Sequence, residues 1–141
     1  GLADGRGLVA AMAFGAQGVW MGTRFIASHE ARAHDNYKNK IVDTDTAGTL
    51  VTRAHSGKTC RLIRNGFTES WSGREAEIEP YPLQAMNVGH PASLRGRIEG
   101  DVENGVLPAG QSSGLIHDVP SADGIVRSVM DEARSALSTL T

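Results

Sequence analysis

Apolar and polar residues near the start of the chain repeat with the spacing of a helix. Leu8, Ala11, Met12 and Gly15 follow a three-four spacing, which gives one small, apolar helix face. Asp4 stands before this run as a candidate N-cap, because its carboxylate is able to accept hydrogen bonds from the first free N–H groups. Glycines after the run favour the end of the helix. The pattern therefore predicts a helix that begins after Asp4.

A second apolar pattern follows directly. The run VWMGTRFI, residues 19–26, predicts a short buried strand. A helix that leads into a strand is the repeating half-unit of α/β proteins. Near the other end, Ser121 is a candidate N-cap for a last helix. The apolar stripe of that helix has helical spacing and consists of Ile125, Val129, Ala133, Leu137 and Leu140, widened by Val126 and Met130.

The middle of the chain has a different pattern. Residues 28–42 are polar and helix-prone, with Ser28 or His29 as candidate caps. Residues 49–53 and 60–64 are rich in β-forming side chains, and the segment AHSGKT with Gly57 joins them, which predicts a hairpin. The stretch that follows, up to about residue 107, reads mainly as loops with short helices. It is too long to be one bare connection, so we expect a small fold of its own there.

Composition and charge exclude several classes of protein. The 141 residues carry a formal net charge of −2, which gives no sign-biased field for nucleic acid or an acidic membrane. The single cysteine, Cys60, favours a reducing, cytoplasmic compartment. No apolar run approaches the roughly 18 residues that span a bilayer. We interpret the arginines of the chain that form an apparent basic patch as solvated surface: Arg24, Arg53, Arg61 and Arg64.

Glycine is abundant, with 17 residues, and aromatic residues are scarce at 5%. Glycines cluster in residues 1–7 and 18–23, on either side of the first helix. In α/β folds, ligands lie beyond the carboxyl ends of strands, where backbone N–H groups and a Thr hydroxyl such as that of Thr23 can donate to a phosphate. The alternative is a pair of ordinary turns between strands and helices, because isolated glycines carry little information.

Four segments together resemble one known family in the same order. GLADGRGLVAAMAFGAQGVWMGTRF resembles the C-terminal flavin-binding region of the nitronate monooxygenases, formerly called 2-nitropropane dioxygenases, whose relatives include the flavin-type enoyl-acyl-carrier-protein reductases. AHDNYKNKIV, TRAHSGKTCRLIRNGF and AGQSSGLIHDVPSADGIVRSVMDEA resemble later segments of that family. The resemblance implies an α/β fold. The chain would be the C-terminal part of an FMN-binding TIM barrel, with the seventh helix, the eighth strand and the last helix.

This resemblance also implies a domain division and a cofactor site. Residues 1–27 would be a barrel segment with the FMN phosphate-binding loops, residues 28–107 a small α+β excursion that helps to form the substrate pocket, and residues 108–141 the return to the barrel with the C-terminal helix. The residues implied around the FMN phosphate are Gly1, Trp20, Met21, Gly22 and Thr23. The family usually has Gln in place of Trp20, a change that a backbone contact would survive. Gln111 and Ser112 are implied near the flavin or substrate, or else form a polar turn.

No catalytic base is expected within this chain. The family uses a histidine that lies upstream of the matched region, and the histidines present lack the spacing of metal ligands or of a nucleophile–base pair. We interpret them as surface, turn or structural residues: His29, His34, His55, His90 and His117. Cys60 lacks the context of a reactive thiol. Because the chain opens on Gly1 in the middle of a unit, we expect it to belong to a longer protein.

The activity implied is oxidation of an alkyl nitronate by FMN and O₂, with this chain alone inactive and the missing N-terminal half of the barrel as its partner. An enoyl-thioester reductase that uses NAD(P)H, and a non-catalytic remnant or oligomerisation piece, remain as alternatives. The small-molecule substrate is the expected partner, without nucleic acid or membrane, and a homo-oligomer is left open.

Overall fold

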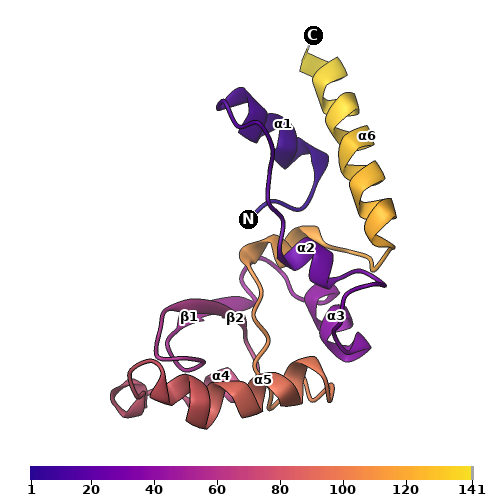
Figure 1. Ribbon diagram of the computed structural model, residues 1–141. Coiled ribbons are helices and arrows are strands. Elements are labelled where there is room, and N and C mark those ends of the chain that lie inside the picture. Colours follow the sequence, from indigo (N-terminus) through magenta and orange to yellow (C-terminus); the bar gives the residue numbers. More distant parts are fainter. Residues whose placement is uncertain (141) are drawn as a thin grey trace.

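The computed structural model describes residues 1–140, in which helices predominate and one antiparallel hairpin forms the sheet (Figure 1). The N-terminal and C-terminal helices lie side by side, and the hairpin and the shorter helices form the opposite end of the molecule. The elements in chain order are α1 (Gly5–Ala13), α2 (Thr23–Ile26), α3 (Asp35–Val42), β1 (Thr49–Thr52), β2 (Cys60–Ile63), α4 (Gly66–Ser70), the 3-10 turn η1 (Glu75–Glu77), the π-helical turn η2 (Ala85–Gly89), α5 (His90–Arg97), the 3-10 turn η3 (Gln111–Leu115) and α6 (Ala122–Leu140).

The first helix begins and ends as its sequence predicts. The Asp4 side chain accepts a hydrogen bond from the N–H of Gly7 at 2.9 Å, which satisfies one of the free donors of the first turn. After the helix, Gly15 has φ +95°, a left-handed conformation that glycine adopts without strain, and its N–H donates to the carbonyl of Met12. The prediction of a helix capped by Asp4 is confirmed.

Helix α1 packs against α6 through a glycine. A Cβ atom on Gly5 would lie 2.3 Å from the backbone N of Ala133 and 2.4 Å from the carbonyl O of Val129, so only glycine allows the two backbones to approach this closely. The N–H of Gly5 also donates to the Glu132 carboxylate at 2.9 Å. The start of α1 is therefore fixed to the middle of α6.

The last helix confirms its predicted cap and half of its predicted stripe. The hydroxyl of Ser121 accepts a hydrogen bond from the N–H of Gly124 at 3.0 Å. The buried residues of α6 are Ile125, Val129 and Ala133. Leu137 and Leu140 are 49% and 76% exposed, so the buried part of the stripe ends at Ala133. The apolar stripe thus continues onto a part of α6 that is exposed within residues 1–140.

The prediction of a buried strand over residues 19–26 is wrong for this structure. The backbone from residue 18 to residue 22 forms no ladder, α2 begins at Thr23, and the Trp20 side chain is 95% exposed. A strand exists only where a neighbour receives its hydrogen bonds, and within the described residues no strand lies beside this segment. The eighth strand of the expected barrel is therefore not formed here.

The predicted hairpin is confirmed. β1 and β2 pair antiparallel, with Thr49 opposite Ile63 and Thr52 opposite Cys60, and Gly57 has φ +80° in the connecting turn. The helix expected over residues 28–42 is shorter, because α3 begins only after His34. The His34 Nδ1 accepts a hydrogen bond from a backbone N–H of the first turn, which caps the helix at that point.

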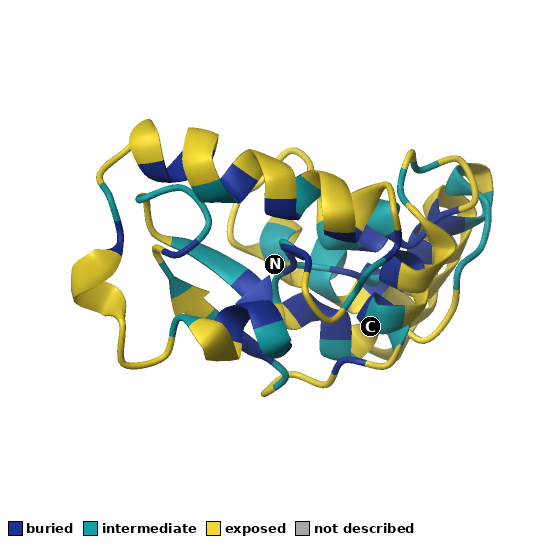
Figure 2. Ribbon diagram, turned by 90° about the horizontal axis from the view of Figure 1, so that it is seen from below, coloured by how far each residue is buried: buried dark blue, intermediate teal, exposed yellow. Residues whose placement is uncertain are grey.

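Two groups of buried side chains hold the molecule together. One joins α3, the end of β2 and the segment before η3, and includes Tyr37, Ile41, Ile63 and Leu107. The other lies between the hairpin, α4 and α5. Figure 2 shows buried positions on the inner sides of the helices and exposed positions on their outer sides. Among residues 1–140, no helix is long and apolar enough to cross a membrane.

Candidate functional site

The first turn of α2 presents unpaired backbone donors. The carbonyl of Gly22 accepts hydrogen bonds from the N–H groups of Phe25 and Ile26, whereas the N–H groups of Gly22, Thr23 and Arg24 have no acceptor within residues 1–140. A Cβ atom on Gly22 would meet no heavy atom within 4 Å, so the space next to this turn is open. N–H groups of a first helical turn that face open space form a favourable position for an anion.

A second segment of the chain closes on this turn. The Thr23 hydroxyl accepts a hydrogen bond from the N–H of Gly110 at 3.0 Å. A Cβ atom on Gly110 would lie 3.5 Å from the Ser112 hydroxyl and 3.6 Å from that of Thr23, and a Cβ atom on Gly1 would lie 2.9 Å from the Ser112 hydroxyl. Residues from the start, the α2 turn and η3 therefore meet at one place, which we call the glycine seat: Gly1, Gly22, Thr23, Gly110 and Ser112.

The other residues that the family resemblance implies for the cofactor site do not all lie in the glycine seat. The Trp20 side chain extends into solvent, and Met21 is half-buried. Gln111 is exposed, whereas its neighbour Ser112 is 7% exposed and lies in the glycine seat. The position of Trp20 agrees with a backbone role at most, because its ring contacts no partner in the seat. Gly110 was not singled out from the sequence, although it belongs to the matched AGQSSG segment.

A cavity of about 500 Å³ adjoins the glycine seat at Gly22. It is mostly apolar, and its lining consists of Gly22, Phe25, Ile26, Ala31, Arg32, Ala33, Tyr37, Arg97 and Pro108. The Tyr37 hydroxyl donates to the carbonyl of Pro108 at 2.5 Å, and desolvation by burial raises the pKa of Tyr37 far above its ordinary value. Tyr37 is therefore a structural hydrogen-bond donor, and this cavity contains no histidine that would serve as a base.

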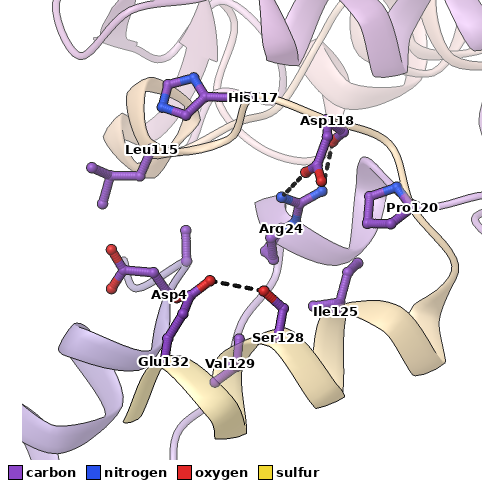
Figure 3. Close-up of a pocket in the computed structure, with 11 residues that line it drawn as sticks. Asp4, Arg24, Leu115, His117, Asp118, Pro120, Ile125, Ser128, Val129 and Glu132 are labelled. Carbon is purple, nitrogen blue, oxygen red and sulfur yellow. Dashed lines mark hydrogen bonds and ion pairs between the residues drawn. The ribbon is translucent and has the colours of Figure 1, made fainter. Parts of the chain in front are cut away.

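A second, more polar cavity of about 220 Å³ lies between the residues just before α1, Arg24 of α2, the segment from Leu115 to Pro120 and α6 (Figure 3). Its carboxylates already have partners. Glu132 accepts hydrogen bonds from the N–H of Gly5 and from the Ser128 hydroxyl, Asp4 caps α1, and Asp118 is bound to Arg24. Glu132 and Asp4 thus serve the joint between α1 and α6, whereas Asp118 serves the contact with α2.

Arg24 is the functional candidate that the sequence did not reveal. The interpretation of Arg24 as solvated surface is wrong, because the residue is only 6% exposed. Its guanidinium donates to the carboxylate and the backbone carbonyl of Asp118 and to the carbonyl of Ala27. A partner 94 positions away leaves no local pattern by which this burial could be predicted.

Cys60 and His55 form the one approach between a thiol and an imidazole in the described residues, with 4.0 Å between Sγ and Nδ1. Desolvation raises the pKa of Cys60, and desolvation together with the charges of His90 and Arg97 lowers the pKa of His55. Both groups therefore remain neutral, which is the opposite of an activated thiolate. Residues 1–140 also contain no group of three metal-ligating side chains in reach of one ion.

The sequence model of one family, described as nitronate monooxygenase, matches residues 1–132. The chain belongs to the nitronate monooxygenase family. A probable nitronate monooxygenase of Staphylococcus aureus strain MSSA476 is 36% identical over 132 residues, which are 94% of this chain and 37% of that protein. The chain thus spans little more than a third of the length of this relative.

Two solved structures are similar to this chain in fold and sequence. FabK from Thermotoga maritima is 39% identical, with a TM-score of 0.84 over 99% of this chain and 44% of that structure. A nitroalkane oxidase from Streptomyces ansochromogenes is 26% identical, with a TM-score of 0.84 over 99% of this chain and 39% of that structure. Coverage of less than half of each structure is consistent with a chain that forms part of an α/β barrel.

Proposed function

We propose that this chain supplies the phosphate-binding part of an FMN-dependent enzyme that oxidises alkyl nitronates with O₂. The observation that carries the proposal is the glycine seat, in which the N–H groups of Gly22, Thr23 and Arg24 have no acceptor within residues 1–140 and the space beside Gly22 is open. A phosphate monoester needs several donors at one point and tolerates no nearby carboxylate. The seat meets both conditions, because its members are glycines and hydroxyl residues.

The residues of the seat fit the cofactor in a specific way. The phosphate would lie against the first turn of α2, where the N–H groups of Gly22, Thr23 and Arg24 lack an acceptor. The Thr23 hydroxyl, which uses a lone pair for Gly110, keeps its proton for donation to a phosphate oxygen. Gly1 and Ser112 would form the wall opposite α2. When bound, FMN supplies the electron-accepting and O₂-reactive chemistry that no side chain provides.

The role of this chain in the reaction is binding and orientation. The apolar cavity beside Gly22 would exclude water from the ligand, and its aromatic and aliphatic side chains would contact an alkyl group. No histidine lies in that cavity, so we propose that the base for neutral nitroalkanes comes from outside these 141 residues. The assignment of residues 28–107 as a substrate-side excursion is part of the same proposal.

A second candidate is reduction of an enoyl thioester by NAD(P)H on the same flavin site. It is supported by the 39% identity to the FabK structure, compared with 26% to the nitroalkane oxidase. The phosphate seat would be the same in both enzymes. The two functions differ in the electron donor and the second substrate, which the glycine seat does not select.

One set of assays separates these functions. The enzyme that contains this chain together with the rest of the proposed barrel is purified and analysed for bound FMN, for O₂ uptake with propyl-2-nitronate and for NADPH oxidation with crotonyl thioester. Bound FMN with nitronate-dependent O₂ uptake supports the first proposal, and bound FMN with only thioester-dependent NADPH oxidation supports the second. Absence of FMN after reconstitution would contradict both and favour a non-catalytic chain.

A further inference from the structure

Two consecutive residues of α2 hold both ends of η3. Thr23 binds the N–H of Gly110 just before the turn, and Arg24 binds Asp118 three residues after it. The Arg24 guanidinium donates to the Asp118 carboxylate at 2.9 Å, to the Asp118 carbonyl at 2.7 Å and to the Ala27 carbonyl at 2.8 Å. Figure 3 shows this side chain directed from α2 to Asp118. The position of η3 relative to α2 therefore depends on both contacts.

The energetics of Arg24 favour a geometric role over a stabilising one. Its side chain is 8% exposed whereas that of Asp118 is 69% exposed, so the ion pair is screened on one side while the guanidinium is desolvated. The buried Nε of Arg24 has no hydrogen-bond partner in residues 1–140, which adds a further unfavourable term. Two of the three acceptors are backbone carbonyls, so the guanidinium fixes main-chain positions rather than one mobile side chain.

We infer that Arg24 is a positioning residue for the phosphate of the cofactor, an inference that rests on the proposed function. The Arg24 side chain reaches Asp118, and it acts by holding the segment that follows η3 against α2. Ser112, which lies in η3, is thereby held beside Gly110, whose Cβ position is 3.5 Å from the Ser112 hydroxyl and 3.6 Å from the Thr23 hydroxyl. The backbone N–H of Arg24 is present whichever side chain stands there, so its side chain can be tested separately.

Arginine is required for this role because of its shape. The planar guanidinium reaches three acceptors in a fixed fork, whereas a lysine ammonium is a point charge on a flexible stem. Arg24→Lys therefore retains the charge and loses the simultaneous contacts with Ala27 and Asp118. The expected result is a seat whose two walls move relative to each other and bind a phosphate less tightly, while the rest of the flavin site is unchanged.

The test compares the affinities of FMN and riboflavin, which differ only in the phosphate. In the purified holoenzyme stripped of its cofactor, Arg24→Lys should weaken FMN binding by about tenfold or more and leave riboflavin binding unchanged. Arg127→Lys is the matched control, because Arg127 is exposed and pairs with Asp123 on α6, far along the chain from the seat. It should change neither affinity. Asp118→Asn, which removes the charge of the ion pair but keeps an accepting oxygen and the backbone carbonyl contact, should have a smaller effect in the same direction.

The results of this binding test distinguish the proposed phosphate site from the proposed role of Arg24. If the wild-type protein binds FMN no better than riboflavin, the proposed phosphate seat fails and the role of Arg24 fails with it. If the wild type prefers FMN and Arg24→Lys keeps that full preference, the seat stands and the positioning role is overturned. Equal weakening of FMN and riboflavin would also overturn it, since that result describes a general loss of structure. If Arg24→Lys does not fold, the ratio of the FMN affinity to the riboflavin affinity is measured in Asp118→Asn. A ratio equal to that of the wild type overturns the positioning role.

Discussion

The hydroxyl of Thr23 accepts a hydrogen bond from the N–H of Gly110 at 3.0 Å, across 87 positions of the chain. A hydroxyl has two acceptor lone pairs and one donor proton, so this contact leaves the proton available. The same oxygen atom therefore joins the α2 turn to η3 and offers a donor beside the unpaired N–H groups of α2. This double use places a structural and a binding role on one side chain.

Substitution of Thr23 separates its hydroxyl from its shape. Thr23→Val keeps the branched side chain but loses the acceptor for Gly110 and the donor for a phosphate, so FMN binding should weaken by about tenfold or more. Thr23→Ser keeps the hydroxyl and should bind FMN within about threefold of the wild type. Fluorescence titration with FMN measures both. Equal affinities for the valine and serine variants would contradict a role for the hydroxyl.

The joint between α1 and α6 should be intolerant of a single methyl group. Gly5→Ala places a Cβ atom within 2.5 Å of three atoms of α6, two of them backbone atoms, so the helices must separate. We expect a loss of about 1–3 kcal/mol in the free energy of unfolding. Gly7→Ala is the control, because its Cβ atom would meet only movable side-chain atoms of Leu2 and Asp4. Urea denaturation that ranks the two variants equally would contradict this packing.

Acid should remove the charge-dependent part of the α1 cap. Desolvation raises the pKa of Asp4, but hydrogen bonds from the Gly7 N–H and the Arg6 side chain outweigh it, and the net pKa lies below its ordinary value. A pKa that is lower in the folded state contributes stability above the unfolded pKa, which is about 3.9, and this contribution is lost as the pH falls through the folded value.

The matched variant is Asp4→Asn, which keeps a capping oxygen without the charge. Its free energy of unfolding should lie below that of the wild type at pH 7, and the difference should shrink as the pH falls below about 4. Denaturant titrations between pH 7 and pH 3 measure this difference. A difference that stays constant over that range would show that the Asp4 charge has no role in the cap.

Local signals in the sequence predicted the elements that depend on local chemistry. The Asp4 and Ser121 caps, the end of the first helix at its glycines and the hairpin around Gly57 each require only neighbours a few residues away, and the structure has all of them. The apolar run around Trp20 shows the limit of this approach. Its composition is that of a strand, but a strand also needs a hydrogen-bonded neighbour, which residues 1–140 do not provide.

The candidate site could be predicted only in part for the same reason. Glycine and threonine at residues 22 and 23 indicate an anion site from their chemistry, and the resemblance to a known family brings in Gly1 and Ser112. The contacts that assemble the seat join Thr23 to Gly110 and Arg24 to Asp118 across more than 80 positions. Such pairs depend on tertiary folding, so no spacing rule identifies the burial of Arg24.

The most direct test of the central claim places a carboxylate in the glycine seat. Gly22 has φ −97° and open space at its Cβ position, so Gly22→Asp should fold normally while its charge repels a phosphate. Gly18→Asp, at another exposed glycine with open space, is the matched control. The FMN content of the purified proteins is measured after reconstitution. The account predicts an empty Gly22→Asp protein and a fully loaded Gly18→Asp protein, and wild-type FMN content in Gly22→Asp would contradict it.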